Sequence, residues 1–98
     1  RRSLILNLLA EIPGFKTNIP EGAFYVFPDI SYYLGRTISG QKIATAGDFA
    51  LFLLEKAGVA TVTGEAFGDP NCIRISYAAA ESDIIEAIKR IKSALKVD

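Results

Sequence analysis

Apolar residues recur at helical spacing in three stretches of the chain, and this periodicity predicts three amphipathic helices. The first helix opens the chain and is expected to end at Pro13-Gly14, because proline and glycine commonly follow the end of a helix. The last is expected from about Glu81 to Leu95, where Glu86 can pair with Arg90 one turn later. The apolar faces consist of Leu4, Ile5, Leu8, Leu9 and Ile12 in the first helix and of Ile84, Ile85, Ile88, Ile91 and Leu95 in the last.

The middle helix is expected over Ala46 to Ala57. Thr45 is a candidate N-cap, and Asp48 three residues later makes a short-armed version of a capping box. Gly58 stands where a residue with left-handed backbone usually ends a helix. In contrast, the cap position of the last helix holds Ala80, which lacks a side-chain oxygen and should cost about 1 kcal/mol. The middle helix has a broad apolar face made of Phe49, Phe52, Leu53 and Leu54.

Short runs of aromatic and β-branched residues predict the strands. Phe15 to Ile19 is expected to be extended, and Ala23 to Phe27 is expected to form a strand that Pro28 closes. Two further strands are expected over Val59 to Val62 and Ile73 to Tyr77, with a glycine-bearing loop between them.

The segment from Asp29 to Thr45 is the least regular part of the chain. It contains glycines, serines and only scattered apolar residues, so we interpret it as a surface excursion with a helical turn near Ser31 to Leu34. Tyr32 and Tyr33 are expected to serve there as packing residues rather than in chemistry.

The order of these elements is helix, strand, long loop, helix, strand, strand, helix. This order favours the α+β class, as a two-layer α/β sandwich whose helices are packed on one face of the sheet. The sheet is expected to be small and mainly antiparallel, because the chain has no room for successive βαβ crossovers. A length of 98 residues, half of them apolar, predicts a single domain over residues 1–98.

Charge and composition narrow the possible partners. Eleven basic and eleven acidic residues give no net charge, which argues against nucleic acid or an anionic membrane as a partner. No apolar run approaches the roughly 20 residues of a membrane span. The single Cys72 is expected to be a buried thiol, and a reducing cytoplasm is the natural location. Because the chain contains no Met, we interpret it as part of a larger protein.

An arginine in the middle of a short strand is the most informative chemical feature. Ile73 and Ile75 alternate with Arg74, so one face of the strand is apolar and the other polar. A guanidinium held on a rigid strand can grip a planar carboxylate with two parallel hydrogen bonds. From the strand alone, a solvent-exposed arginine on the outer face of a core strand is the commoner situation.

Other catalytic groups are scarce. The chain has no His, so the commonest general base and metal ligand is absent from the sequence, and we expect no metal site. The acidic residues are scattered over turns and a helix start rather than paired. Lysines are expected in loops or on polar helix faces, where none is desolvated into an imine-forming nucleophile; they include Lys42, Lys56, Lys89, Lys92 and Lys96.

Three motifs follow one another in a characteristic order. They are Pro20-Glu21-Gly22-Ala23-Phe24-Tyr25-Val26-Phe27-Pro28, the stretch from Glu55 to Gly68 with the sequence EKAGVATVTGEAFG, and Ile73-Arg74-Ile75-Ser76-Tyr77-Ala78. In order and spacing they resemble the C-terminal small domain of class I/II aminotransferases, the pyridoxal-phosphate enzymes of the aspartate aminotransferase type. The resemblance covers essentially the whole chain.

The resemblance implies roles for three residues. Arg74 occupies the position whose arginine binds the α-carboxylate of the substrate in that family. Gly22 and Tyr25 fall in the segment that lies near the substrate, and they are further candidates for substrate binding. The substrates implied are an amino acid and a 2-oxo acid, between which the enzyme moves an amino group.

The resemblance also implies what lies outside this segment. In the family, pyridoxal phosphate is held by a lysine and a carboxylate partner of the large domain, and neither appears in these residues. The chain alone is therefore expected neither to hold the cofactor nor to transaminate. The full-length protein is expected to be a cytoplasmic homodimer in which this domain works beside the large domain of the same chain.

Two alternatives stay open at this point. The chain could be a stand-alone small-molecule-binding or interaction module with a ferredoxin-like sandwich, because fold does not fix function. Within the resembled superfamily, β-eliminating lyases and a synthase acting on S-adenosylmethionine keep the same carboxylate arginine, so Arg74 does not separate them from aminotransferases. The sequence does not specify the side chain of the donor amino acid.

Overall fold

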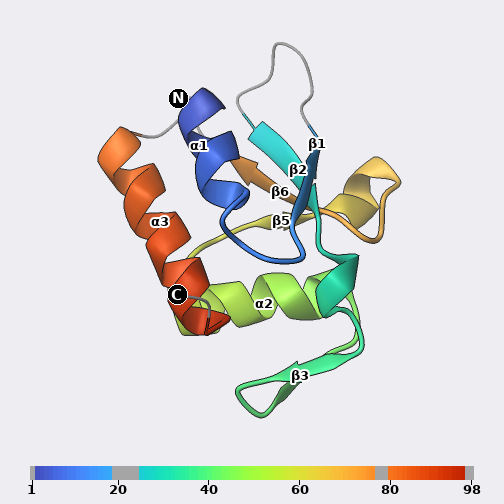
Figure 1. Ribbon diagram of the computed structural model, residues 1–98. Coiled ribbons are helices and arrows are strands. Elements are labelled where there is room, and N and C mark those ends of the chain that lie inside the picture. Colours follow the sequence, from blue (N-terminus) through green and yellow to red (C-terminus); the bar gives the residue numbers. More distant parts are fainter. Residues whose placement is uncertain (1, 19–24, 77–79, 97–98) are drawn as a thin grey trace.

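The computed structural model describes residues 2–18, 25–76 and 80–96 (Figure 1). Three α-helices and six short strands lie within them, together with two 3-10 turns. In chain order the elements are α1 (Arg2–Leu9), β1 (Lys16–Asn18), β2 (Tyr25–Asp29), η1 (Ser31–Tyr33), β3 (Arg36–Ile38), β4 (Gln41–Ile43), α2 (Ala46–Ala57), β5 (Val62–Thr63), η2 (Gly64–Phe67), β6 (Ile73–Ser76) and α3 (Glu81–Ala94).

A four-stranded antiparallel sheet in the order β1-β2-β6-β5 forms one layer of the molecule. The helices form the other layer, in which α3 contacts both α1 and α2 (Figure 1). Val26, Ile73 and Ile75 are buried on the side of the sheet that shares a core with the helices. The predicted α+β sandwich, with a small antiparallel sheet and helices on one face, is confirmed.

Helix α2 has the predicted bounds, and both of its ends carry the predicted signals. Asp48 N–H donates to Thr45 Oγ1 over 3.1 Å, while Asp48 Oδ2 accepts from the Thr45 N–H over 3.3 Å. Gly58 has a φ of 68° and its N–H donates to the Leu54 carbonyl over 3.1 Å. Ala80 at the cap of α3 makes no side-chain capping bond, as its side chain requires.

Helix α1 ends at Leu9, three residues earlier than its apolar pattern suggests. The Glu11 and Ile12 N–H groups donate to carbonyls three residues back, at 3.1 and 3.0 Å, so the chain tightens into turns before Pro13. A residue that precedes proline is disfavoured in helical conformation, which explains the early end. Ile12 nevertheless remains buried in the core.

The segment between β2 and α2 is more regular than the sequence predicts. Strands β3 and β4 form a hairpin whose turn residues Ser39 and Gly40 have φ angles of 50° and 80°. This pair of positive φ values is typical of the tight hairpin turn that matches strand twist. Ile43 at the end of the hairpin is fully buried, so the segment joins the core rather than leaving it. The predicted helical turn is confirmed as η1.

Tyr33 in η1 packs in the core, and its neighbour Tyr32 packs at the surface. The Tyr33 ring stacks on Phe49 of α2 at a centroid distance of 5.2 Å, and its hydroxyl donates to the Pro13 carbonyl. Burial raises the pKa of Tyr33. Tyr32 is half exposed. Its ring meets the Tyr33 ring edge to face at a centroid distance of 5.0 Å and lies under the Arg36 guanidinium, 4.0 Å from the ring centroid, so both tyrosines pack as predicted.

Strand ends and helix faces differ from the prediction in smaller ways. Strand β2 continues through Pro28 to Asp29, and the extended segment after α2 pairs with β6 only from Val62. The predicted apolar faces are too wide, because Leu54 and Ile85 are about half exposed at 51% and 47%. Gly22, with the other residues of 19–24 and 77–79, falls outside the described residues. In the described part of the chain, no helix has the length and apolar character needed to span a bilayer.

Thr61 carries the one buried side-chain oxygen that has no hydrogen-bond partner among the described residues. A buried hydroxyl without a hydrogen-bond partner costs about 1–3 kcal/mol. Thr61→Val is therefore expected to raise the free energy of unfolding by about 1 kcal/mol in urea titrations. The control Thr37→Val alters an exposed threonine and should shift stability by less than about 0.5 kcal/mol. A less stable Thr61→Val protein would contradict the prediction.

Candidate functional site

Arg74 lies in the middle of β6, the second of the two central strands of the sheet. Its neighbours Ile73 and Ile75 are buried against the helices, while Arg74 itself is half buried. Because successive side chains of a strand point to opposite faces, Arg74 projects from the face that the helices leave uncovered. The alternation predicted from the sequence is confirmed.

Two aromatic residues of β2 share this face. Strands β2 and β6 pair with Tyr25 opposite Ser76 and Val26 opposite Ile75, and an isolated bridge joins Asp29 to Cys72 in the same register. That register puts Phe27 opposite Arg74. Directly opposed residues of an antiparallel pair project to the same side, so Tyr25, Phe27 and Arg74 form one patch on the uncovered face.

The patch has a defined geometry. The Arg74 guanidinium carbon lies 5.0 Å from the centroid of the Tyr25 ring, within cation–π range. The Tyr25 and Phe27 rings meet edge to face, with centroids 5.1 Å apart and planes at 85°. Both rings are half buried. The Tyr25 and Phe27 rings thus form an aromatic platform beside the Arg74 guanidinium. A cation held in this way suits an anionic group of a ligand.

Of the three predicted site residues, the structure brings Arg74 and Tyr25 together. Gly22 lies outside the described residues. Phe27 was not singled out from the sequence, although it stands two residues after Tyr25 and strand alternation places both on one face. What the sequence could not supply is the cross-strand register that sets Phe27 opposite Arg74.

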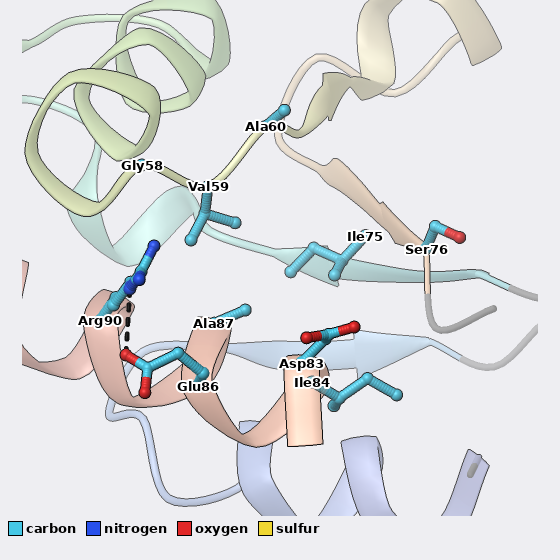
Figure 2. A pocket seen from close by; sticks show the side chains of 10 residues that line it. All are labelled: Gly58, Val59, Ala60, Ile75, Ser76, Asp83, Ile84, Glu86, Ala87 and Arg90. Atoms are coloured by element: carbon cyan, nitrogen blue, oxygen red, sulfur yellow. Dashed lines mark hydrogen bonds and ion pairs between the residues drawn. The ribbon is translucent and has the colours of Figure 1, made fainter. Parts of the chain in front are cut away.

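A groove of about 380 Å³ opens on the other side of β6, against α3 (Figure 2). Figure 2 shows Val59, Ile75 and Ala87 around its apolar floor, with an ion pair between Glu86 and Arg90 at one end. The Arg90 Nε to Glu86 Oε2 distance is 3.0 Å, which confirms the predicted pair. Arg74 does not line this groove, so the groove and the Arg74 patch are separate features.

Hydrogen bonds between its own backbone groups hold the loop before β6 together. Gly64 N–H donates to the Cys72 carbonyl over 2.7 Å, and Asp69 N–H donates to the Gly64 carbonyl over 2.8 Å. The Cys72 thiol donates to Asp69 Oδ2 over 3.1 Å and is buried, as predicted. Burial, that hydrogen bond, and the negative charges of Asp69 and Asp29 raise the pKa of Cys72 to about 12.

The described lysines lack the environment of an imine-forming residue. Such a lysine needs desolvation or a neighbouring cation to become a nucleophile. Of the lysines considered from the sequence, Lys92 is the least exposed. Its Nζ lies 2.8 Å from Glu11 Oε1, in an ion pair that joins the last turn of α3 to the turn after α1. The others, Lys42, Lys56, Lys89 and Lys96, are exposed. These lysine side chains therefore do not suit the formation of an imine with a cofactor.

Comparisons with known proteins agree over nearly the whole chain. The family model for aminotransferase class I and II matches residues 1–91. An aspartate aminotransferase of Streptomyces avermitilis is 42% identical over 95 residues, which make up 97% of this chain and 23% of that protein. A bifunctional aspartate aminotransferase and glutamate/aspartate-prephenate aminotransferase of Petunia hybrida is 47% identical over 96 residues, or 97% of this chain and 20% of that protein.

Solved structures show the same likeness in three dimensions. The crystal structure of the aspartate aminotransferase from Rhizobium meliloti matches with a TM-score of 0.90 and 45% identity, over 97% of this chain and 24% of that one. The chain thus spans about a quarter of the length of the relatives it matches. Because both the family model and these alignments take in nearly all of its residues, the chain belongs to the class I and II aminotransferase family.

Proposed function

We propose that the chain is the C-terminal small domain of an enzyme that moves an amino group between an amino acid and a 2-oxo acid. The observation that carries the proposal is Arg74 on the uncovered face of the sheet, over the Tyr25 ring. Identities of 42–48% with aspartate aminotransferases and aspartate/prephenate aminotransferases support an acidic amino acid such as aspartate as one donor.

In this proposal Arg74 binds the α-carboxylate that every amino acid and 2-oxo acid substrate shares. Its guanidinium fork donates two parallel hydrogen bonds to the two carboxylate oxygens, which fixes the plane of the carboxylate as well as its position. Holding that end of the substrate orients the bond at the α-carbon for proton removal by a base outside these residues. Gly22 and Tyr25 border the same substrate.

The family implies pyridoxal phosphate as cofactor. The lysines described here do not fit it, since they are exposed or, in the case of Lys92, paired with Glu11. We therefore assign the cofactor to the part of the polypeptide outside this chain. The 98-residue chain alone accordingly has no transaminase activity.

In this proposal Arg74 lies on one domain and the cofactor on another. Substrate binding therefore depends on the two domains moving toward each other. When a carboxylate arrives, its bond to Arg74 forms fully only if the two parts close around it, so binding favours the closed arrangement. Closure also excludes water from the reaction. As its partners we propose the large domain of the same chain and, in a cytoplasmic homodimer, a second copy of the full-length protein.

The test is a steady-state assay of the full-length protein against a panel of amino acids with 2-oxoglutarate. The expected result is glutamate formation in step with loss of the donor amino acid, aspartate among the active donors. The 98-residue chain serves as the control and should form none. Release of ammonia and pyruvate without glutamate would indicate a β-eliminating lyase and contradict the proposal.

A stand-alone binding module is not favoured. The alignments run through nearly every residue of the chain and cover about a quarter of much longer aminotransferases. A self-contained sensor with a similar sandwich would not be expected to share 42–48% of its residues with those enzymes.

A further inference from the structure

We propose that Tyr25 and Phe27 are positioning residues for Arg74: the two rings hold its guanidinium in place before a carboxylate arrives. The inference rests on the proposed function, because it concerns how the same arginine binds its substrate. It assigns the rings a task distinct from direct contact between the Tyr25 hydroxyl and the substrate.

The backbone fixes the three side chains relative to one another. Tyr25 and Phe27 belong to one strand and Arg74 to its antiparallel neighbour, and the register Tyr25–Ser76, Val26–Ile75 is held on both sides by β1 and β5. A shift of β2 by one residue in that register would turn Val26 out of the core. The platform is therefore as rigid as the centre of the sheet.

The side-chain contacts run in series, from Arg74 to Tyr25 and from Tyr25 to Phe27. The guanidinium carbon is 5.0 Å from the Tyr25 ring centroid, and Phe27 meets that ring edge to face at 5.1 Å. The face of an aromatic ring carries partial negative charge, which attracts the guanidinium. Phe27 in turn restricts the rotation of the Tyr25 ring, so each contact limits the next side chain.

This restriction matters because arginine is long and loses much rotamer freedom when it is fixed. If the rings fix the side chain in advance, the substrate does not have to order it, and binding is tighter than it would be to a mobile arginine. The effect applies equally to bound substrate and transition state. It should therefore appear in KM and leave kcat nearly unchanged.

The experiment compares Tyr25→Leu, Tyr25→Phe and Phe27→Leu in the full-length protein by steady-state kinetics. Tyr25→Leu removes the ring and is expected to raise KM for the amino acid about tenfold, with kcat within about twofold. Tyr25→Phe keeps the ring, so it should raise KM several-fold less than Tyr25→Leu does. Phe27→Leu should give an intermediate rise.

A matched control removes bulk beside Arg74 without removing a ring. Val62 pairs with Arg74 from the opposite strand and is 41% exposed. Val62→Ala should leave KM within about twofold of the parent. As a second measurement, stepwise fluorination of a phenylalanine at position 25 weakens the ring's negative face without changing its shape, and KM should rise with each fluorine. This series stays informative if Tyr25→Leu folds poorly.

The outcomes separate the inference from the function on which it rests. An equal KM rise in Tyr25→Phe and Tyr25→Leu would mean that the hydroxyl contacts the substrate, and it would overturn the positioning role. A flat KM across the fluorinated series would also overturn it. If Arg74→Leu leaves KM unchanged, the proposed function itself fails; if only the Tyr25 and Phe27 variants are silent, the inference alone fails.

Discussion

Arg74→Leu in the full-length protein is expected to raise KM for the amino acid at least about a hundredfold and to lower kcat as well. If Arg74 has the proposed role, the variant removes two charge-assisted hydrogen bonds to the substrate carboxylate, each worth roughly 1.5–3 kcal/mol. A total of about 3 kcal/mol already corresponds to more than a hundredfold in binding. The fall in kcat follows because a substrate held only at its other end is poorly oriented for proton removal. Steady-state kinetics with both the amino acid and the 2-oxo acid measure these changes.

Two controls sharpen this result. Arg74→Lys keeps the positive charge but loses the fork, so its KM should lie between those of the parent and Arg74→Leu. Arg90→Leu removes another arginine, which lies on α3 and forms an ion pair with Glu86. That substitution should leave the kinetic constants nearly unchanged. If Arg74→Leu has parental KM values, Arg74 does not bind the carboxylate.

Gly64→Ala is expected to destabilise the folded chain by about 3 kcal/mol or more. A methyl group at this position overlaps the carbonyl oxygen of Asp69 and would lie 2.8 Å from that of Cys72. Both obstacles are backbone atoms, and both residues are bound to Gly64 by main-chain hydrogen bonds of 2.8 and 2.7 Å. The loop cannot move aside without breaking those bonds, so the strain cannot be relieved by a side-chain rotation.

Gly47→Ala provides the matched glycine control. Gly47 lies in the first turn of α2, where an added methyl would meet only Thr45 Oγ1, at 3.5 Å. Alanine in a helix should stabilise the chain by about 0.5–1 kcal/mol relative to glycine. Urea unfolding of both variants measures the two opposite changes. A Gly64→Ala protein as stable as the parent would show that the loop is not held together as described.

Local signals predicted the helices best. The capping box at Thr45, the left-handed Gly58 and the apolar period between them set both ends of α2 without help from the rest of the molecule. Periodicity alone did not reveal how much of a helix face is covered. Ile85 and Leu54 fit the apolar stripe but stay about half exposed, because coverage depends on where neighbouring helices lie.

The hairpin and the aromatic platform needed long-range information. Strands β3 and β4 are three residues each, too short for an alternating pattern to stand out, and only the Ser39-Gly40 pair marked the turn. The sequence predicted Arg74 as a candidate from its own strand and from the motif around it. The position of Phe27 opposite Arg74 depends on the pairing of β2 with β6, which a single sequence does not specify.

The reactivity of Cys72 toward alkylating reagents reports how often the loop before β6 opens. Alkylating reagents attack the thiolate, and a pKa of about 12 leaves very little of Cys72 in that form at neutral pH. Cys72 is also buried, with 1% of the residue exposed to solvent. Since this is the single cysteine of the chain, covalent labelling marks only those molecules whose loop has opened, and its rate follows how often that happens.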